Sequence, residues 1–226
     1  MFKNDAITGK GEQTRQHIFE CALDLFREHG FDATTMQQIA ARAQVVKSAA
    51  YYYFPSKEAI IQAYYETVQA EQEKLCGPLF EQTKDLKARL AIAMHSKFDL
   101  ARKDRKLLGV VFRYTGEPQH PLSCLGSGTE EIRLRSIRIF HEAIAREDLP
   151  KDLQELLPLS LWSLQMGLLV LFLYDNSPGQ KRTRALADGA LDLTLSMVKL
   201  ARLPILKPLR KKILTLLRDA ELLPAL

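Results

Sequence analysis

The chain has 226 residues, of which 46% are hydrophobic and 26% are charged, the balance of a soluble globular protein with one large or two small domains. Its three cysteines, Cys21, Cys76 and Cys124, are far apart and odd in number, which argues against a disulfide framework and favours a reduced cytoplasm. The net charge of +5 is uneven: residues 1–75 carry 8 basic and 10 acidic side chains, residues 76–175 carry 14 and 13, and residues 176–226 carry 10 and 4.

The first predicted helix follows a polar segment. Met1–Lys10 has no apolar stretch, so we expect no signal peptide there. In the sequence TRQHIFECALDLFREHGF, Thr14 is the expected N-cap, and one apolar face is formed by Ile18, Ala22, Leu25 and Phe26. Gly30 then supplies the left-handed residue that ends the helix.

Residues 34–57, TTMQQIAARAQVVKSAAYYYFPSK, predict two short helices joined by a tight turn. Thr35 and Gln38 form a capping box at the start of the first, and the turn covers 43–45. The second runs from about Val46 to Phe54, where Pro55 stops it and Ser56 caps the next helix. Its outward residues are Lys47, Ser48, Ala49, Tyr52 and Tyr53. This is the layout of a helix-turn-helix that binds DNA.

Residues 14–61 resemble the N-terminal domain of the tetracycline-repressor (TetR) family of bacterial transcriptional regulators. The matching residues are Thr14-Arg15, Ile18, Ala22, Leu25-Phe26, Gly30-Phe31, Thr34-Thr35, Ile39-Ala40, Ala43, Val45, Tyr51, Phe54 and Lys57-Glu58. The resemblance implies an all-α dimer whose second domain binds a small molecule, and whose ligand releases it from a palindromic operator.

Two positions depart from the family pattern. The family usually has Gly in the turn and Ser or Thr after the valine, where this chain has Gln44 and Val46. A non-Gly residue in a left-handed turn costs roughly 1 kcal/mol. Loss of a polar N-cap costs on the order of another 1 kcal/mol. We expect the unit to fold, because its apolar positions are intact.

The family's DNA contacts carry over by position. Gln37 would lie near a base edge, and bases would be faced by Lys47, Ser48 and Ala49. Phosphates would be reached by Tyr51, Tyr52 and Tyr53, with Tyr52 also near a thymine methyl, and by Lys57 at a helix N-terminus. Thr35 would both cap the first short helix and contact DNA. For Tyr51 a place in the core is an equal alternative, and Lys47 and Lys57 could be ordinary solvated lysines.

The rest of the chain also predicts helices. We expect a helix-turn-helix domain over 1–57, a linking helix over 56–76 that ends near Gly77-Pro78, and a second domain over 77–226. Within that domain helices are expected over 84–105, 107–114 and 130–146. Between them, residues 115–128 predict a long loop that is a candidate gate.

Residues 156–174 are the most apolar segment. Pro158, Ser160, Ser163 and Gln165 interrupt it, whereas a membrane-spanning helix needs about 20 mostly apolar residues. We therefore favour a buried helix and no membrane. The resemblance implies that helices 156–174 and 180–202 pair with their counterparts in a homodimeric four-helix bundle. Gly167 and Gly189 would allow close approach.

A ligand pocket is expected between helices 84–105, 107–114, 130–146 and 156–174. Its candidate lining is Met94, Phe98, Phe112, Trp162, Gln165, Met166 and Leu169. These side chains suggest a hydrophobic or aromatic effector, and ordinary core packing is the alternative for each. A further helix over 204–223 is amphipathic and basic, and either docks on the protein's own core or lies on a membrane surface.

No catalytic motif stands out: HExxH, CxxC, a phosphate-binding glycine loop and a nucleophile elbow are all absent. We expect no enzyme, no cofactor and no metal site. Two hypotheses remain. One is a ligand-responsive repressor bound to double-stranded DNA in the cytoplasm. The other is an all-helical dimeric interaction protein that has lost specific DNA binding, which Gln44, Val46 and the acidic N-terminal part make conceivable.

Overall fold

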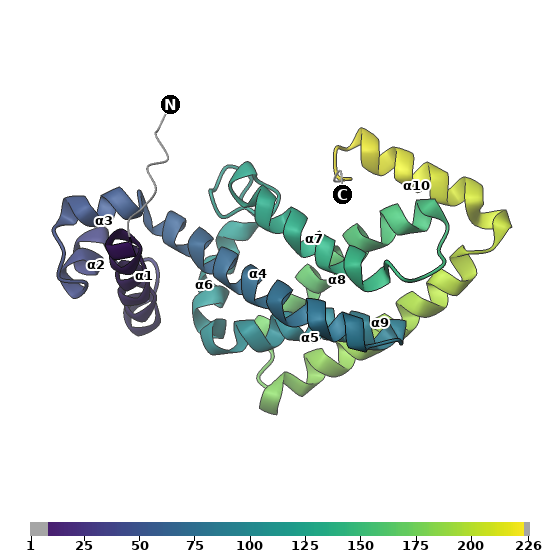
Figure 1. The fold of residues 1–226 in the computed structure, drawn as a ribbon, viewed down its shortest axis with the longest axis horizontal. Coiled ribbons are helices and arrows are strands. Elements are labelled where there is room, and N and C mark those ends of the chain that lie inside the picture. The colour runs from purple at the N-terminus through teal and green to yellow at the C-terminus, as the bar shows by residue number, and fades with distance from the viewer. Residues whose placement is uncertain (1–8, 224–226) are drawn as a thin grey trace. The chain divides into compact units, whose positions relative to one another are not determined.

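A computed structural model describes residues 9–223, and Figure 1 shows its helices. Within that range the chain is helical and contains no strand, which confirms the all-α prediction. The helices are α1 (Gly9–His29), α2 (Met36–Arg42), α3 (Lys47–Tyr53), α4 (Lys57–Gln82), α5 (Leu86–Ala101), α6 (Arg105–Thr115), α7 (Glu130–Ile144), α8 (Lys151–Tyr174), α9 (Lys181–Ala201) and α10 (Lys207–Asp219). Most of Met1–Lys10, where we expected no signal peptide, lies outside the described residues.

The chain forms two compact units whose limits differ from the predicted domains. The first unit includes residues 9–65 together with Asp104–Gly128, and the second includes Glu66–Lys103 with residues 129–223. Helix α4 contributes to both. The segment 104–128, which we expected in the second domain, therefore belongs to the first unit.

The first unit begins with α1, whose predicted apolar face is buried. Ile18, Ala22, Leu25 and Phe26 are all in the core. Gly30 has φ +86° and ends the helix as expected. Thr14 is not the N-cap: α1 starts at Gly9, and the Thr14 hydroxyl donates to the Lys10 carbonyl one turn back (2.9 Å). The helix extends further because no proline interrupts residues 9–13, although Gly9 and Gly11 are poor helix formers.

Helix α6 and the loop after it are held in the first unit by polar contacts between distant parts of the sequence. The Arg27 guanidinium donates to both carboxylate oxygens of buried Asp104 (2.6 and 3.2 Å). The Tyr114 hydroxyl donates to Asp32 (2.7 Å), and the Gln62 amide donates to the Pro121 carbonyl (2.8 Å). These contacts give the segment 104–128 its place beside α1 and the start of α4.

Helix α4 does not end at Gly77-Pro78, so the predicted boundary at residue 76 is wrong. Pro78 lies inside the helix and is exposed, and so is Lys74, whose carbonyl loses its helical hydrogen bond to the proline. The last turn is retained because Phe80 is buried and the Arg146 guanidinium donates to the Phe80 and Glu81 carbonyls (3.1 and 3.2 Å). Tertiary contacts thus outweigh the local helix-breaking signal.

Helix α8 also extends past a proline. It starts at Lys151 rather than at residue 156, and buried Pro158 lies within it. By length and composition α8 could cross a membrane. However, 44% of its most apolar window is buried inside the chain, and core helices of soluble proteins share these properties.

The second unit is built around α8. Helix α7 packs along α8, and α5 contacts both α7 and α9. In the core, the rings of Phe98 and Phe172 stack with centroids 5.1 Å apart. Helix α10 packs against α8, where Arg210 donates to Asp152 (2.7 Å) and Arg218 to Glu155 (2.6 Å). Of the two alternatives for the basic C-terminal helix, these contacts correspond to docking on the protein's own second unit.

Candidate nucleic-acid interface

The first helix of the helix-turn-helix, α2, starts with the predicted capping box. The Gln38 backbone N–H donates to the Thr35 hydroxyl oxygen (3.2 Å), and the Thr35 N–H donates to the Gln38 side-chain oxygen (2.8 Å). Met36, Ile39 and Ala40 are buried, and Gln37 is exposed. The cap and these apolar residues together fix α2 and direct Gln37 to solvent.

Helix α3 is seven residues long and has one buried residue, Ala50. Together with Phe54, which follows the helix, Ala50 attaches α3 to the unit. Every predicted base-facing or phosphate-facing side chain of α3 is at least partly accessible. Lys47, Ser48, Tyr51 and Tyr52 are exposed, and Ala49 and Tyr53 are partly exposed.

The tyrosines of α3 form an accessible aromatic surface. Tyr52 is 75% exposed and Tyr51 is 44% exposed, so the core alternative for Tyr51 is excluded. The Tyr52 and Tyr53 rings meet edge to face with centroids 5.0 Å apart. The Lys47 ammonium lies 5.9 Å from the centre of the Tyr51 ring. Phenol hydroxyls and an ammonium on one short helix are groups that donate hydrogen bonds to phosphate oxygens or base edges.

Lys57 lies at the start of α4 but has partners within the protein. Its ammonium donates to the carbonyls of Phe31 (2.7 Å) and Asp32 (3.3 Å), and lies 4.6 Å from the centre of the Phe31 ring. An ammonium has three N–H donors, so one remains for a phosphate. Lys57 therefore stabilises the segment after α1 in addition to any contact with DNA.

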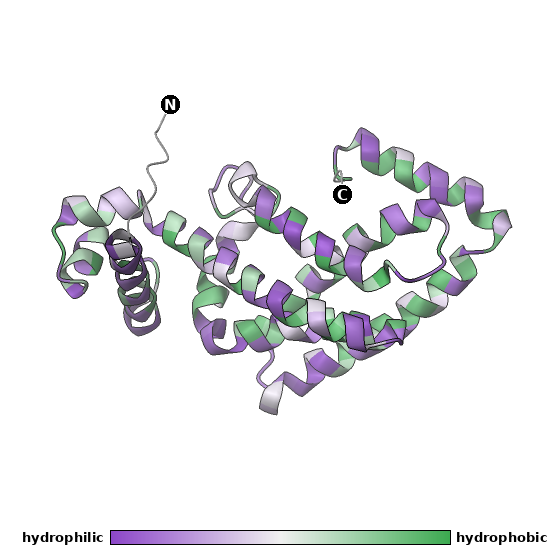
Figure 2. Cartoon of the chain, in the orientation of Figure 1, coloured by the Kyte–Doolittle hydropathy of each residue, from purple (hydrophilic) through white to green (hydrophobic). Residues whose placement is uncertain are grey.

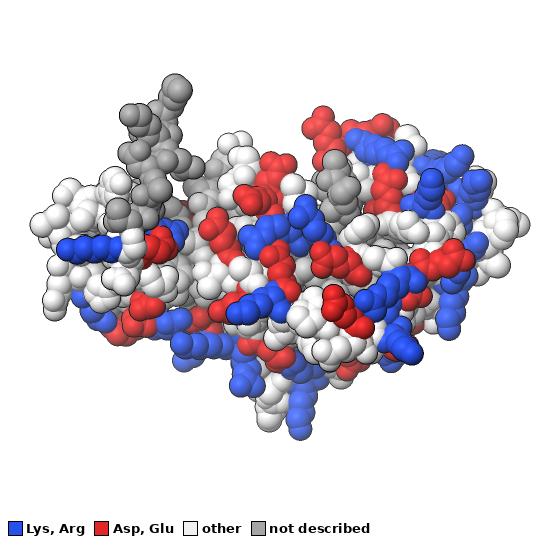
Figure 3. All heavy atoms as spheres, in the orientation of Figure 1, with Lys and Arg blue, Asp and Glu red and all other residues white. Residues whose placement is uncertain are grey.

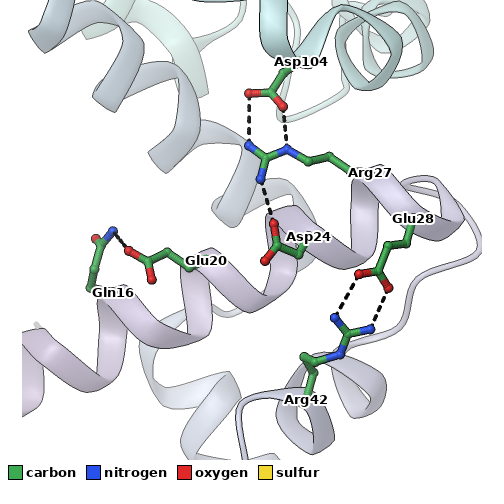
Figure 4. A network of polar contacts seen from close by, with 7 residues as sticks. All are labelled: Gln16, Glu20, Asp24, Arg27, Glu28, Arg42 and Asp104. Carbon is green, nitrogen blue, oxygen red and sulfur yellow. Dashed lines mark hydrogen bonds and ion pairs between the residues drawn. The ribbon is translucent and has the colours of Figure 1, made fainter.

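Two arginines of the first unit, Arg27 and Arg42, are paired with carboxylates, as Figure 4 shows. Arg42 donates to both carboxylate oxygens of Glu28 (3.1 and 2.6 Å), and Arg27 bridges Asp24 and Asp104. Arg15, whose guanidinium lies 4.9 Å from the centre of the Phe54 ring, was not among the predicted contacts. With these arginines paired, Lys47 is the one cationic side chain that α3 presents, in a part of the chain whose overall composition is slightly acidic. Figure 3 shows acidic and basic side chains interspersed over the face that it draws.

The predicted effector-binding residues are divided between the two units. Phe112 is part of α6 in the first unit. The other six are in the second unit, where Met94, Phe98, Trp162 and Gln165 are buried and Met166 and Leu169 are partly exposed. The Gln165 amide donates to the Ala93 carbonyl (3.0 Å), so this buried glutamine has a hydrogen-bond partner.

A groove of about 460 Å³ lies in the second unit between α4 and α7. It was not predicted, and its lining includes charged side chains: Glu73, Arg135, Arg138 and Glu142, with Leu134 and Ile139. In the sequence, charged and apolar residues alternate over 130–142, the segment that provides most of the lining of this groove. Within residues 9–223, no three His, Cys, Asp or Glu side chains are grouped so that they could hold a metal ion.

Two family descriptions match this chain. The one named "Bacterial regulatory proteins, tetR family" matches residues 18–64, and "Tetracyclin repressor-like, C-terminal domain" matches residues 89–213. The chain belongs to the tetR family of bacterial regulatory proteins. The predicted resemblance is confirmed and extends to the second unit.

Curated proteins are similar to this chain over short stretches. The A-factor receptor protein of Streptomyces griseus is 40% identical over 72 residues, 30% of this chain and 26% of the relative. RutR of Escherichia coli (strain K12) is 48% identical over 46 residues, 20% of this chain and 22% of the relative. The matched region spans about a quarter of the length of these relatives.

Solved structures share the fold over most of the chain. A putative TetR-family regulator from Syntrophomonas wolfei has a TM-score of 0.63 at 17% identity, covering 80% of this chain and 94% of its own. FadR from Bacillus subtilis in complex with stearoyl-CoA has a TM-score of 0.58 at 18% identity, covering 79% and 96%. FadR from Thermus thermophilus in complex with lauroyl-CoA has a TM-score of 0.56 at 21% identity, covering 78% and 90%.

The two departures from the usual tetR-family turn are accommodated. Gln44 takes the left-handed conformation itself, with φ 54°. Val46 is the N-cap of α3 and supplies no side-chain hydrogen bond, but its carbonyl accepts from the Ala49 and Ala50 N–H groups (2.9 and 3.3 Å). The turn and α3 therefore form without the glycine and the polar cap, and the alternative of a lost DNA-binding unit gains no structural support from these residues.

Proposed function

We propose that this protein is a ligand-responsive, non-enzymatic transcriptional regulator, specifically a repressor that leaves a palindromic operator when a small molecule binds. The observation that carries the proposal is the exposed set Lys47, Ser48, Tyr51 and Tyr52 on α3, in a chain of the tetR family. Such a role belongs in the cytoplasm, where the DNA is.

The primary test is the salt dependence of binding to an operator selected from random duplexes. Fluorescence anisotropy should show a logarithm of affinity that falls linearly with the logarithm of salt, by about 0.9 for each phosphate contact. Lys47→Ala should reduce affinity and also weaken the preference for the selected sequence. Lys74→Ala, an exposed lysine in the second unit, is the matched control and should change neither. Binding without salt dependence would support the interaction-protein alternative.

A second test asks whether the Lys57 ammonium contacts DNA or only stabilises the protein. If its third N–H donor contacts a phosphate, Lys57→Ala weakens binding to all duplexes alike and lowers the salt slope by about 1. Because the ammonium also donates to the Phe31 and Asp32 carbonyls, the variant should also lose thermal stability. A stability loss with an unchanged salt slope would show that Lys57 has only a structural role.

A homodimer is supported by uncovered apolar stripes on α8 and α9. On α9, the exposed residues Leu186, Leu193, Met197 and Leu200 recur at helical spacing on the side away from buried Leu191 and Val198. On α8 the corresponding exposed stripe is Ser160, Gly167, Leu171 and Tyr174. A side chain at Gly167 or Gly189 would meet nothing within 4 Å, so a partner helix has room to approach closely.

Pairing through these stripes would provide two copies of α3, which must lie about 34–36 Å apart to enter successive major grooves. Leu193→Glu should convert the dimer into a monomer in light-scattering measurements and abolish operator binding. Lys199→Ala changes the charge by the same amount outside the stripe and should leave the dimer intact. A dimer that survives Leu193→Glu would place the interface elsewhere.

The effector is proposed to be hydrophobic. Buried Met94, Phe98 and Trp162 support this, as do two proteins of similar fold that bind acyl-CoA. Binding would alter the separation of the two α3 helices and so weaken the contact with the operator. Release of labelled operator, screened against apolar small molecules, tests this part of the proposal.

A further inference from the structure

Two side chains of the turn before α3 are presented to solvent. The Gln44 side chain is exposed and has no hydrogen-bond partner among residues 9–223, and Val46 is 70% exposed. Their neighbours in the turn differ, since Ala43 is buried and Val45 is half-buried. The turn is therefore attached to the first unit through residues 43 and 45, and residues 44 and 46 point outward.

The backbone of the turn is fixed by hydrogen bonds to α2. The Gln44 N–H donates to the Ala41 carbonyl (3.1 Å), and the Val45 N–H donates to the Ala40 carbonyl (3.0 Å). Val46 is branched at Cβ, which restricts its side chain to few rotamers. Because both outward side chains start from a fixed backbone, a partner that binds them loses little free energy to ordering.

Both residues are unfavourable choices for stability alone. Gln44 has φ 54°, in the left-handed region that glycine adopts without strain. Val46 is the N-cap of α3 and makes no side-chain hydrogen bond there, whereas a serine or threonine would accept one from the helix. Residues in such strained conformations cluster at functional sites, where the surrounding structure holds them in place. The combination indicates a role for these side chains other than stabilising the unit.

Val46 belongs to the accessible surface of α3. Four large hydrophobic residues are exposed in the described part of the first unit, and three of them are Val46, Tyr51 and Tyr52, with Leu125 as the fourth. Consecutive Cα atoms are about 3.8 Å apart, close to the rise of about 3.4 Å between base pairs. Val46 therefore lies within about one base-pair step of the base that Lys47 would contact.

We propose that the turn is itself part of the DNA interface, with Val46 as a specificity-determining residue and Gln44 as a phosphate contact. The inference deepens the proposed function and rests on it. The methyl groups of Val46 contact the C5 methyl of a thymine, a group that no other base presents in the major groove. The Gln44 amide donates to a phosphate oxygen, a contact that carries no sequence information. The operator half-site then contains a thymine beside the base pair that Lys47 contacts.

Uracil substitution in the selected operator tests Val46, because uracil lacks only the methyl group of thymine. Each thymine of a half-site is replaced in turn, and affinity is measured by fluorescence anisotropy. Wild type should lose about fourfold in affinity at one thymine, the effect of removing one buried methyl group. Val46→Ser should not respond at that thymine and should keep the wild-type response at the others. The uracil response decides rather than the overall affinity, since a serine hydroxyl also donates to phosphates.

Glycine at position 44 tests the phosphate contact. Gln44→Gly should reduce affinity about fivefold for every duplex and leave the salt slope unchanged, because a neutral amide releases no counterion. Gln180→Gly is the matched control, since Gln180 has a similar backbone conformation (φ 52°) in the second unit, and it should bind as wild type does.

Thermal denaturation separates a DNA contact from a structural role. Gln44→Gly and Val46→Ser should both melt about 1–4 °C above wild type, because each removes an unfavourable feature of the turn. A purely structural residue would not combine higher stability with lost binding. Glycine and serine are residues that the family usually has at these positions, so both variants should fold, and circular dichroism checks this.

Two results would overturn the inference: a Val46→Ser variant that responds to every uracil substitution as wild type does, or a Gln44→Gly variant that binds as tightly as wild type. Either result, with operator binding by wild type intact, refutes the turn contacts alone. Failure of wild type to bind any duplex refutes the proposed function itself.

Discussion

The α2–α3 segment and the core of the second unit use their side chains in opposite ways. Helix α3 has seven residues, one of them fully buried, and presents its aromatic rings to solvent. The second unit buries most of its aromatic rings, as in the stacked pair Phe98 and Phe172, and places polar groups among them. Local caps and turns thus position α3 for contact, whereas long-range packing stabilises the second unit. Substitutions in the two regions should therefore have separable effects on DNA affinity and on stability.

The largest expected effect is on stability, from truncating a buried ring. Phe98→Ala should reduce the free energy of unfolding by about 3–5 kcal/mol, because it removes the contact with Phe172 and leaves a cavity. Tyr52→Ala removes an exposed ring and should change stability by no more than about 0.5 kcal/mol while reducing operator affinity. Urea denaturation and anisotropy measure the two effects. Similar stability losses would contradict the contrast between the regions.

The next effect concerns pH and Lys97, a lysine of α5 whose ammonium donates to the Gln69 side-chain oxygen (2.9 Å). Because the pKa of Lys97 is lowered in the folded state to about 8, the unfolded chain binds more protons between about pH 8 and pH 10.5, and the contribution of this residue to stability rises with pH there. Lys97→Met should remove that rise, on the order of 2 kcal/mol across the window. Urea denaturation at pH 7, 8, 9 and 10 measures it. Lys87→Met should follow the wild-type curve, and an unchanged curve for Lys97→Met would show that the ammonium is fully hydrated.

A smaller effect is expected from the cap of α2. Thr35→Ala removes the hydroxyl that accepts from the Gln38 N–H, and should cost about 1 kcal/mol of stability. Thr35→Ser keeps the hydroxyl and should be close to wild type in thermal denaturation. If the alanine and serine variants are equally stable, the capping box contributes nothing in solution.

The smallest expected effect concerns two non-glycine residues with a left-handed backbone conformation, one in each unit. Gln44 and Gln180 both have positive φ, 54° and 52°. Replacing either by glycine relieves the left-handed strain but makes the unfolded chain more flexible, so we expect a net gain of about 0.5 kcal/mol in each case. Differential scanning calorimetry would detect it. A loss at Gln44 with a gain at Gln180 would mean that the Gln44 side chain has a separate role in the turn.

Local signals predicted the N-terminal helices well, and long-range contacts explain the failures. The capping box at Thr35, the positive φ of Gly30 and the exposure of Tyr52 all follow from residues within one or two turns. Pro78 misled the prediction because the contacts that retain the helix come from Arg146, far away in the chain. The assignment of 104–128 to the first unit depends on pairs such as Arg27 and Asp104, which no local pattern indicates.

The candidate sites show the same division. The DNA contacts of α3 could be predicted from the sequence, because a seven-residue helix with one buried residue exposes most of its other side chains at least in part. The groove could not be predicted, because Glu73 and Arg135 come from two helices, α4 and α7, and meet only on folding. Figure 2 shows hydrophobic and hydrophilic residues side by side along these helices, a pattern that predicts amphipathic packing without saying which polar groups meet.

The sequence by itself determined the helical class, the family and the outward surface of α3, since helical periodicity, caps and turns act between neighbours in the chain. Tertiary structure decided where α4 and α8 begin or end, which unit includes α6, and which charges are compensated. Those outcomes depend on burial and on hydrogen bonds between residues that are distant in sequence, and such contacts outweigh a local preference of about 1–3 kcal/mol.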